Sequence, residues 1–234
     1  MSEFLFPYDL KTEALAFGDL RLQIEGLRDV EATVDTIFEI LQEENRPELL
    51  QELCPYFGVV WPAAVGLTQY MSVLLQKENA TDLSVVELGC GLGLPGLFLA
   101  KRGIPVVCTD QHSDVPVFLA RNLRHNDIRG LEYRNFDWMK ETREIGAPTS
   151  RSWVIGSDIL YESQHPKTVA EAIVRVLSAG TERVIIADPG RPYLQQFAEE
   201  MKRVISHRPE IQIERCATGN HVGKEVFVLD FRRA

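Results

Sequence analysis

The sequence VVELGCGLG, Val85–Gly93, begins as an apolar segment that carries an acid, Glu87, near its end and runs into a glycine-dense turn. Glycines tolerate positive φ in such a turn and let the backbone pass close beneath a bound ligand. A strand that runs through this kind of turn into a helix usually opens the nucleotide-type site of an open α/β sheet. The turn therefore predicts a nucleotide-type ligand and leaves open which one.

Two ligands fit the residues nearest the turn. Gly91–Gly96 satisfies the dinucleotide pattern G-x-G-x-x-G, which is a weak match on its own. Asp110 ends the next apolar segment about 20 residues later, where a carboxylate can accept hydrogen bonds from both ribose hydroxyls. NAD and S-adenosylmethionine both carry an adenosine ribose, so Asp110 fits either ligand.

Acidic and aromatic residues near the turn favour S-adenosylmethionine. Glu87 lies on the strand just before the glycines, where an acid can hold a cationic amino group but would be unhelpful beside a pyrophosphate. Asp137 and Trp138 follow the third predicted strand, where a carboxylate can accept from the adenine amine and an indole can cover its ring. The fourth predicted strand ends at Ser157 and is followed by an acid and a phenol, at the rim where a second substrate would enter.

The elements that must position these residues alternate between helix and strand after residue 58. This alternation predicts an α/β fold with a parallel, doubly wound sheet, Rossmann-like and seven-stranded. The last two strands have only the turn at 218–220 between them, so we expect an antiparallel hairpin at the sheet edge. Helices are expected near 62–77, 94–102, 114–126, 165–179 and 191–206, and strands near 84–88, 105–109, 131–134, 152–157, 183–187, 210–217 and 224–231.

Residues 1–58 form a smaller N-terminal extension in this interpretation, ahead of a main domain at 59–234. Within the extension, residues 20–25 alternate apolar and polar, which predicts a half-buried strand. Apolar residues then recur at helical spacing between Val34 and Leu41, and Pro47 interrupts the pattern before a short helix at Leu49–Leu53.

The composition argues against several kinds of partner. The 234 residues carry a formal net charge of −9, whereas nucleic acid or an acidic membrane would be bound by a basic stripe. No apolar run approaches a membrane span, and Met1–Lys11 lacks the basic start and apolar centre of a secretion signal, so we expect a cytoplasmic protein. The four cysteines form no C-x-x-C pair and the five histidines lack metal-ligand spacing, so we expect reduced thiols and no metal.

The chain resembles the class I, seven-β-strand methyltransferases over roughly residues 59–232, and within them the protein-lysine methyltransferases of methyltransferase family 16. Val85–Gly91 is similar to the first cofactor motif of these enzymes, and Phe136–Trp138 to their adenine motif. Trp61–Ala64 is similar to their Trp-containing segment, and Asp158–Tyr161 matches their Asp-x-x-Tyr/Phe signature. Asp188–Arg191 resembles a feature of the branch that acts on the electron-transfer flavoprotein.

The resemblance implies a protein-lysine N-methyltransferase that uses S-adenosylmethionine, acts on a protein substrate and works as a monomer without metal. The extension would cover the active-site side and help to select the substrate. Asp158 would orient the lysine amine and help to relay its proton, and Tyr161 would form a wall of the channel. The cofactor pocket would be lined by Trp61, Gly89, Cys90, Gly91, Asp110, Trp138 and Ser157, with Glu87 and Asp137 as additional contacts.

Three other functions remain open at this point. A methyltransferase that acts on a small molecule would share every cofactor residue. A methyltransferase-like binding module without activity is disfavoured because Glu87, the glycines, Asp110, Trp138 and Asp158 are all present. A nicotinamide-dependent oxidoreductase is disfavoured because no Tyr-x-x-x-Lys pair is visible and Glu87 is misplaced for phosphates.

Overall fold

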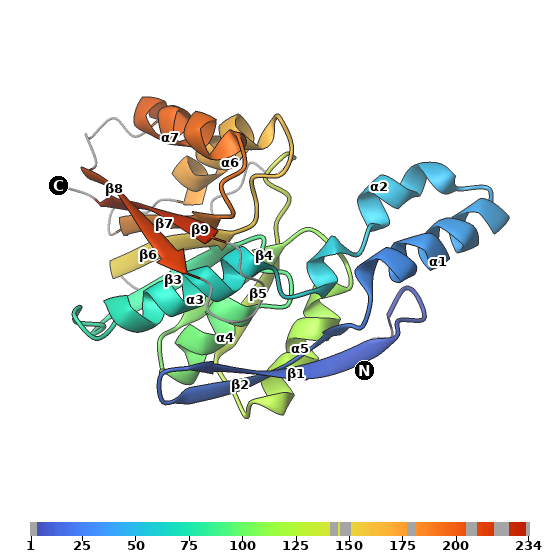
Figure 1. Cartoon of the computed structure of the whole chain (residues 1–234), viewed down its shortest axis with the longest axis horizontal. Helices are drawn as coiled ribbons and strands as arrows, with labels where there is room; N and C mark the ends of the chain where they lie inside the picture. The colour runs from blue at the N-terminus through green and yellow to red at the C-terminus, as the bar shows by residue number, and fades with distance from the viewer. Residues whose placement is uncertain are drawn as a thin grey trace.

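A seven-stranded sheet forms the centre of the computed structural model, which describes residues 4–140, 145, 151–176, 181–204, 210–217 and 225–232. Within these residues the strand order is β5-β4-β3-β6-β7-β9-β8 (Figure 1). The strands are β3 (Leu83–Leu88), β4 (Val106–Asp110), β5 (Leu131–Asn135), β6 (Arg151–Ser157), β7 (Thr181–Asp188), β8 (Glu210–Ala217) and β9 (Glu225–Arg232).

The pairing within this sheet confirms the predicted fold class. Strands β3 to β7 are parallel to one another, whereas β9 is antiparallel to both β7 and β8. The final hairpin therefore forms one edge, with β9 inserted between β7 and β8. The predicted turn at 218–220 lies outside the described residues.

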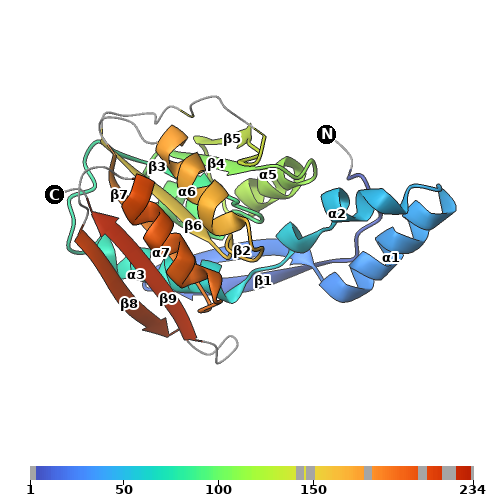
Figure 2. The same cartoon turned by 90° about the horizontal axis from the view of Figure 1, so that it is seen from above.

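Helices cover both faces of the sheet (Figures 1 and 2). One face packs against α3 (Pro62–Leu74), α4 (Leu94–Lys101) and α5 (Val115–His125). The other packs against α6 (His165–Val176) and α7 (Tyr193–Val204). Successive residues of β3 alternate between the two cores, and all six of its residues are buried, as expected for a parallel strand between helical layers. None of the described helices is long and apolar enough to cross a membrane.

The extension adds a hairpin and an arm to this domain. Its elements are β1 (Leu10–Phe17), β2 (Leu20–Leu27), α1 (Val30–Glu43), the 3-10 turn η1 (Pro47–Leu49), α2 (Leu50–Leu53) and the 3-10 turn η2 (Tyr56–Gly58). Strand β2 and both helices were expected, whereas β1 was not. The inward side of β1 begins with Lys11 and Glu13 and becomes apolar only at Leu15 and Phe17, so its alternation is weak. The helices α1 and α2 project away from the sheet (Figure 2).

Asn122 on α5 and Asn126, the residue that caps the end of this helix, bind the free edge of β2. Asn122 Oδ1 accepts from the Glu25 amide at 2.7 Å, and Asn122 Nδ2 donates to the Glu25 carbonyl at 3.1 Å. Asn126 makes the same pair of bonds with Gln23, at 2.8 and 2.7 Å. Side-chain amides thus replace a third strand, and they satisfy backbone groups that would otherwise be unpaired. These bonds fix the hairpin on the main domain.

Asn122→Ala should therefore lower the free energy of unfolding by about 3 kcal/mol, because two backbone groups of Glu25 would lose their partners in a buried place. Urea unfolding followed by circular dichroism measures this loss. The control is Gln51→Ala, at an exposed position on α2, which should stay within about 0.5 kcal/mol of the unaltered chain. Equal effects of the two substitutions would show that the asparagine contacts contribute nothing.

Candidate functional site

The glycine turn lies where the strand order reverses, with β4 on one side of β3 and β6 on the other. Ligands of open α/β sheets bind at this switch point, outside the carboxyl ends of the strands. Gly89 and Gly91 have φ of 59° and 50°. A Cβ on Gly91 would lie 2.9 Å from the Phe57 carbonyl oxygen, and one on Gly89 would lie 2.7 Å from Ile159 Cγ2. Only glycine fits at either position, so the loop is enclosed by the extension and the segment after β6.

Asp110 holds this loop from the end of β4. Its Oδ2 accepts from the Gly91 amide at 3.0 Å, and its Oδ1 accepts from the His112 amide at 3.1 Å. Burial raises the pKa of this carboxyl, and the two amide hydrogen bonds act against that rise. The side chain keeps some exposed surface, so the carboxylate can both shape the loop and meet a ligand.

Glu87 faces away from the crevice side of the turn. It is fully buried, its Oε2 accepts from Cys108 Sγ at 3.3 Å, and a Cβ on Gly96 of α4 would lie 2.5 Å from the same oxygen. The other oxygen, Oε1, has no hydrogen-bond partner among the described residues. In this conformation the carboxyl supports the start of α4, and a direct contact with a cofactor stays a prediction.

The burial of Glu87 makes stability depend on pH. Desolvation raises its pKa from about 4.5 to about 8, so the folded chain holds a proton that the unfolded chain has released between those values. The contribution of this group to stability is therefore greatest below about pH 4.5 and declines until about pH 8.

Glu87→Gln should remove this dependence, since an amide does not titrate. Between pH 5 and pH 8 the variant should gain about 3 kcal/mol of unfolding free energy relative to the unaltered chain, at about 1.4 kcal/mol for each pKa unit. Denaturant unfolding of both chains at the two pH values measures the difference. The same difference at both pH values would mean that Glu87 is not protonated in the fold.

Trp138 lies directly against the glycine turn. A Cβ on Gly89 would lie 3.2 Å from Trp138 Cζ3, and the Trp138 carbonyl accepts from Arg175 Nη2 of α6 at 2.8 Å. Asp137 is engaged locally, because it accepts from the Met139 amide at 2.8 Å and lies 3.2 Å from Lys140 Nζ. The indole thus lies at the turn and the Asp137 carboxylate already has partners, and the adenine contacts of both residues stay predictions.

Asp158 connects three elements just beyond β6. Its Oδ2 accepts from the Ala63 amide in the first turn of α3 at 3.0 Å, and its Oδ1 lies 2.7 Å from Arg191 Nη1. The same nitrogen of Arg191 is 2.8 Å from Asp188 Oδ2, after β7. Asp188 in turn accepts from the Gly190 and Arg191 amides, at 2.8 and 2.7 Å. Asp158 therefore caps α3 from a distance, which matters because Trp61, at the N-cap, makes no side-chain cap bond.

Asp158 Oδ2 accepts from the Ala63 amide, whereas Oδ1 forms an ion pair with Arg191 but no hydrogen bond within the described part of the chain; the residue is held at φ 59°. Burial raises the pKa of its carboxyl and the guanidinium of Arg191 acts against that rise. Non-glycine residues adopt such a φ at a cost that the surrounding structure must support. In this arrangement Asp158 supports the start of α3 and pairs with Arg191, and its direct contact with the acceptor amine stays a prediction.

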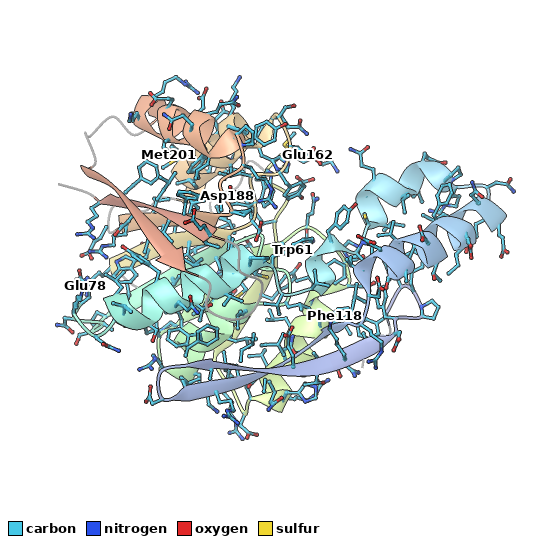
Figure 3. All side chains as sticks on the ribbon, viewed as in Figure 1. Trp61, Glu78, Phe118, Glu162, Asp188 and Met201 are labelled. Carbon is cyan, nitrogen blue, oxygen red and sulfur yellow. The ribbon has the colours of Figure 1, made fainter. Side chains whose placement is uncertain are left out.

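Tyr161 stands at the rim, with 47% of its surface exposed. Partial burial and the carboxylates of Asp110 and Glu162 raise the pKa of its hydroxyl to about 12, so the phenol stays protonated at neutral pH, and its role as a channel wall stays a prediction. Trp61 is half-buried and its Nε1 donates to the Tyr56 carbonyl at 2.8 Å. Figure 3 shows Trp61, Glu162 and Asp188 on the side of the sheet that faces the arm, with Glu78 at the opposite side.

The remaining predicted residues complete the same edge. Ser157 ends β6 opposite Ala187, and the buried Cys90 donates its amide to the Thr109 carbonyl at 2.9 Å. Cys90 carries a free thiol, as do Cys54 and Cys108. The structure thus collects the predicted residues at the carboxyl ends of β3, β4, β5 and β6 and at the start of α3, with Glu87 turned beneath the loop.

Sequence reasoning missed three contacts at this site. The Ala63 amide carries no side-chain signal, and Phe57 meets the loop through its backbone. His165, which contacts Trp138 and Tyr161, follows Tyr161 by four residues but belongs to none of the motifs in the sequence. None of the predicted site residues lines the cavity of about 180 Å³ beside the site. This cavity lies between β1 and the segment that enters α3.

Comparison with known proteins agrees with this geometry. A family model described as lysine methyltransferase matches residues 52–204. Over 154 residues the chain is 29% identical to the histone-arginine methyltransferase METTL23 of Xenopus laevis, covering 61% of this chain and 62% of that protein. It is 30% identical over 153 residues to the protein N-lysine methyltransferase METTL21A of Xenopus tropicalis, covering 62% and 66%. The chain spans less than two thirds of the length of these curated relatives.

Solved structures share the fold at lower identity. Magnesium protoporphyrin IX methyltransferase from Synechocystis PCC 6803 superposes with a TM-score of 0.55 at 14% identity, covering 74% of this chain and 80% of that chain. The glycopeptide N-methyltransferase MtfA superposes with a TM-score of 0.54 at 11% identity, covering 72% and 94%. At this identity the likeness supports the Rossmann-like methyltransferase fold alone.

Proposed function

The chain belongs to the family described as lysine methyltransferase, and we propose that it transfers a methyl group from S-adenosylmethionine to the ε-amine of a lysine in a protein substrate. One observation carries this proposal. The glycine turn, Asp110 and Trp138 meet at the switch point of the sheet, immediately beside Asp158 and Tyr161. The residues predicted to bind the methyl donor and those predicted to receive the acceptor amine therefore lie at the same edge of the sheet.

The residues present fit the adenosyl donor. The Asp110 carboxylate would accept from the ribose hydroxyls while it holds the Gly91 amide, and the Trp138 indole would cover the adenine ring. Gly89 and Gly91 would let the backbone approach the methionine portion. When bound, the cofactor supplies an activated methyl group on a sulfonium.

The acceptor must arrive as a neutral amine, in line with the bond that breaks. Most of the rate should come from holding the two reacting atoms about 3–3.5 Å apart in that orientation. A lysine ordinarily has a pKa of about 10.4, and a cationic donor and partial desolvation both disfavour its ammonium form.

The charge of the arm supports a protein substrate with a basic surface. Glu31, Asp35, Glu39 and Glu43 are exposed at four-residue spacing along α1, which makes one acidic stripe. The arm reaches the site through Tyr56, whose ring lies 6.5 Å from that of Trp61. Charge complementarity of this kind raises association rates and favours particular partners.

An arginine side chain is the second candidate acceptor, favoured by the likeness to METTL23. Both acceptors are tested by incubating the purified chain, S-adenosylmethionine labelled in its methyl group, and an extract of cells that lack the enzyme. Acid hydrolysis of the labelled protein then separates methyl-lysine from methyl-arginine. Label in methyl-lysine supports the proposal, label in methyl-arginine replaces the acceptor, and label confined to small molecules overturns the protein substrate.

A further inference from the structure

His165 occupies the first position of α6, where it is buried, with its side chain 5% exposed. Neither the glycine turn nor the Asp158 contacts involve it. Burial lowers the pKa of the imidazole, and the nearby Glu162 acts against that decrease. Its Nδ1 has no hydrogen-bond partner in the described part of the chain. Burying an imidazole nitrogen without a hydrogen-bond partner costs free energy, so other contacts of the ring must offset this cost.

The ring of His165 contacts two aromatic residues of the site at once. The ring of Trp138 lies 5.7 Å away at 88°, and the ring of Tyr161 lies 4.5 Å away at 85°. Perpendicular pairs at these distances are favourable beyond the apolar area that they bury. Trp138 is the residue expected to cover adenine, and Tyr161 is the one expected to line the amine channel.

Among the described residues, no other aromatic side chain contacts both of those rings. Trp138 follows β5 and Tyr161 follows β6, and these strands lie on opposite sides of β3 in the sheet. Backbone geometry alone leaves each ring attached to a separate loop. His165 is the described side chain whose ring contacts both of them.

We propose that His165 is a positioning residue that sets the Trp138 and Tyr161 rings together, so that the adenine cover and the wall of the amine channel form as one unit. It contacts neither donor nor acceptor in this role. The proposal rests on the proposed function, because it assigns both rings to the methyl-transfer site. It requires a ring at position 165 and does not require a titratable group.

Three substitutions separate ring packing from polarity. His165→Ala removes the ring, His165→Gln keeps a polar side chain without a ring, and His165→Phe keeps a ring without the nitrogens. Calorimetry with S-adenosylhomocysteine measures the donor side, and label incorporated into extract proteins at saturating donor measures the acceptor side. His125→Ala, at a position on α5 whose side chain is 39% exposed, is the matched control.

We expect the Ala and Gln variants to bind S-adenosylhomocysteine about tenfold more weakly and to incorporate less label, because two ring contacts are lost. The Phe variant should restore both quantities to within about twofold of the unaltered chain. Recovery by Phe distinguishes ring positioning from general destabilisation, and it keeps the test valid if the Ala variant fails to fold. Unchanged binding in the folded Gln variant, or loss of binding in a folded Phe variant, overturns the inference alone. Absence of binding by the unaltered chain overturns the proposed function as well.

Discussion

Asp110→Ala should weaken the binding of S-adenosylhomocysteine by about 100-fold, because two hydrogen bonds from ribose hydroxyls to a charged carboxylate would be lost. The same substitution removes the acceptor for the Gly91 amide at 3.0 Å, so the glycine turn would lose a support from β4. Isothermal titration calorimetry measures the affinity, and thermal unfolding measures the change in stability.

Asp110→Asn separates these two effects. Its amide oxygen can still accept from the Gly91 amide, so the turn should keep its support, while the negative charge toward the ribose is gone. We expect an affinity between that of the unaltered chain and that of the Ala variant, with little change in stability. Asp35→Asn, on the exposed side of α1, controls for loss of charge. If the Ala variant binds as tightly as the unaltered chain, Asp110 does not contact the ribose.

Removing the side chain of Asp158 should lower methyl transfer by about 100-fold and leave S-adenosylhomocysteine affinity within a few-fold, because small displacements of reacting groups have effects of this size. The suitable substitution is Asp158→Gly, since glycine accepts the φ of 59° without strain and removes only the side chain. The α3 cap at Ala63 and the partner of Arg191 would both be lost. Label incorporation at saturating donor measures the effect.

Asp158→Asn then decides how the residue acts. Asparagine tolerates a left-handed backbone, and its amide oxygen can keep the Ala63 cap at nearly the same position. If Asp158 works by position, the Asn variant should retain activity within about tenfold of the unaltered chain. An Asn variant as inactive as the Gly variant would show that the negative charge is needed, as expected for a group that orients the amine or relays its proton. Full activity in the Gly variant would remove Asp158 from the mechanism.

The main sheet could be predicted because the sequence carries its signals locally. Parallel strands buried on both faces give continuous apolar segments, and Val184 to Ala187 in β7 is one of them. Strand β1 could not be predicted because its inward residues Lys11 and Glu13 are polar. Gly89 and Gly91 could be predicted from the glycine motif. The structure explains why glycine is needed there, because both residues have positive φ and close neighbours.

The contacts of individual side chains were harder to predict. An acid at the end of a strand was expected for Asp110 and Asp158, and both lie there. The partners of Asp158 are a backbone amide 95 positions earlier in the chain and an arginine after β7, and no local pattern joins them. Glu87 lies on the predicted strand, but strand alternation turns its side chain toward α4 rather than the crevice.

A crystal structure with S-adenosylhomocysteine would test the central claim most directly. We expect the ligand to cross the glycine turn, with its ribose on Asp110, its adenine against Trp138 and its sulfur facing the opening beside Tyr161. Density for the ligand elsewhere, for example in the cavity beneath β1, or density at the turn with the ribose away from Asp110, would contradict the account.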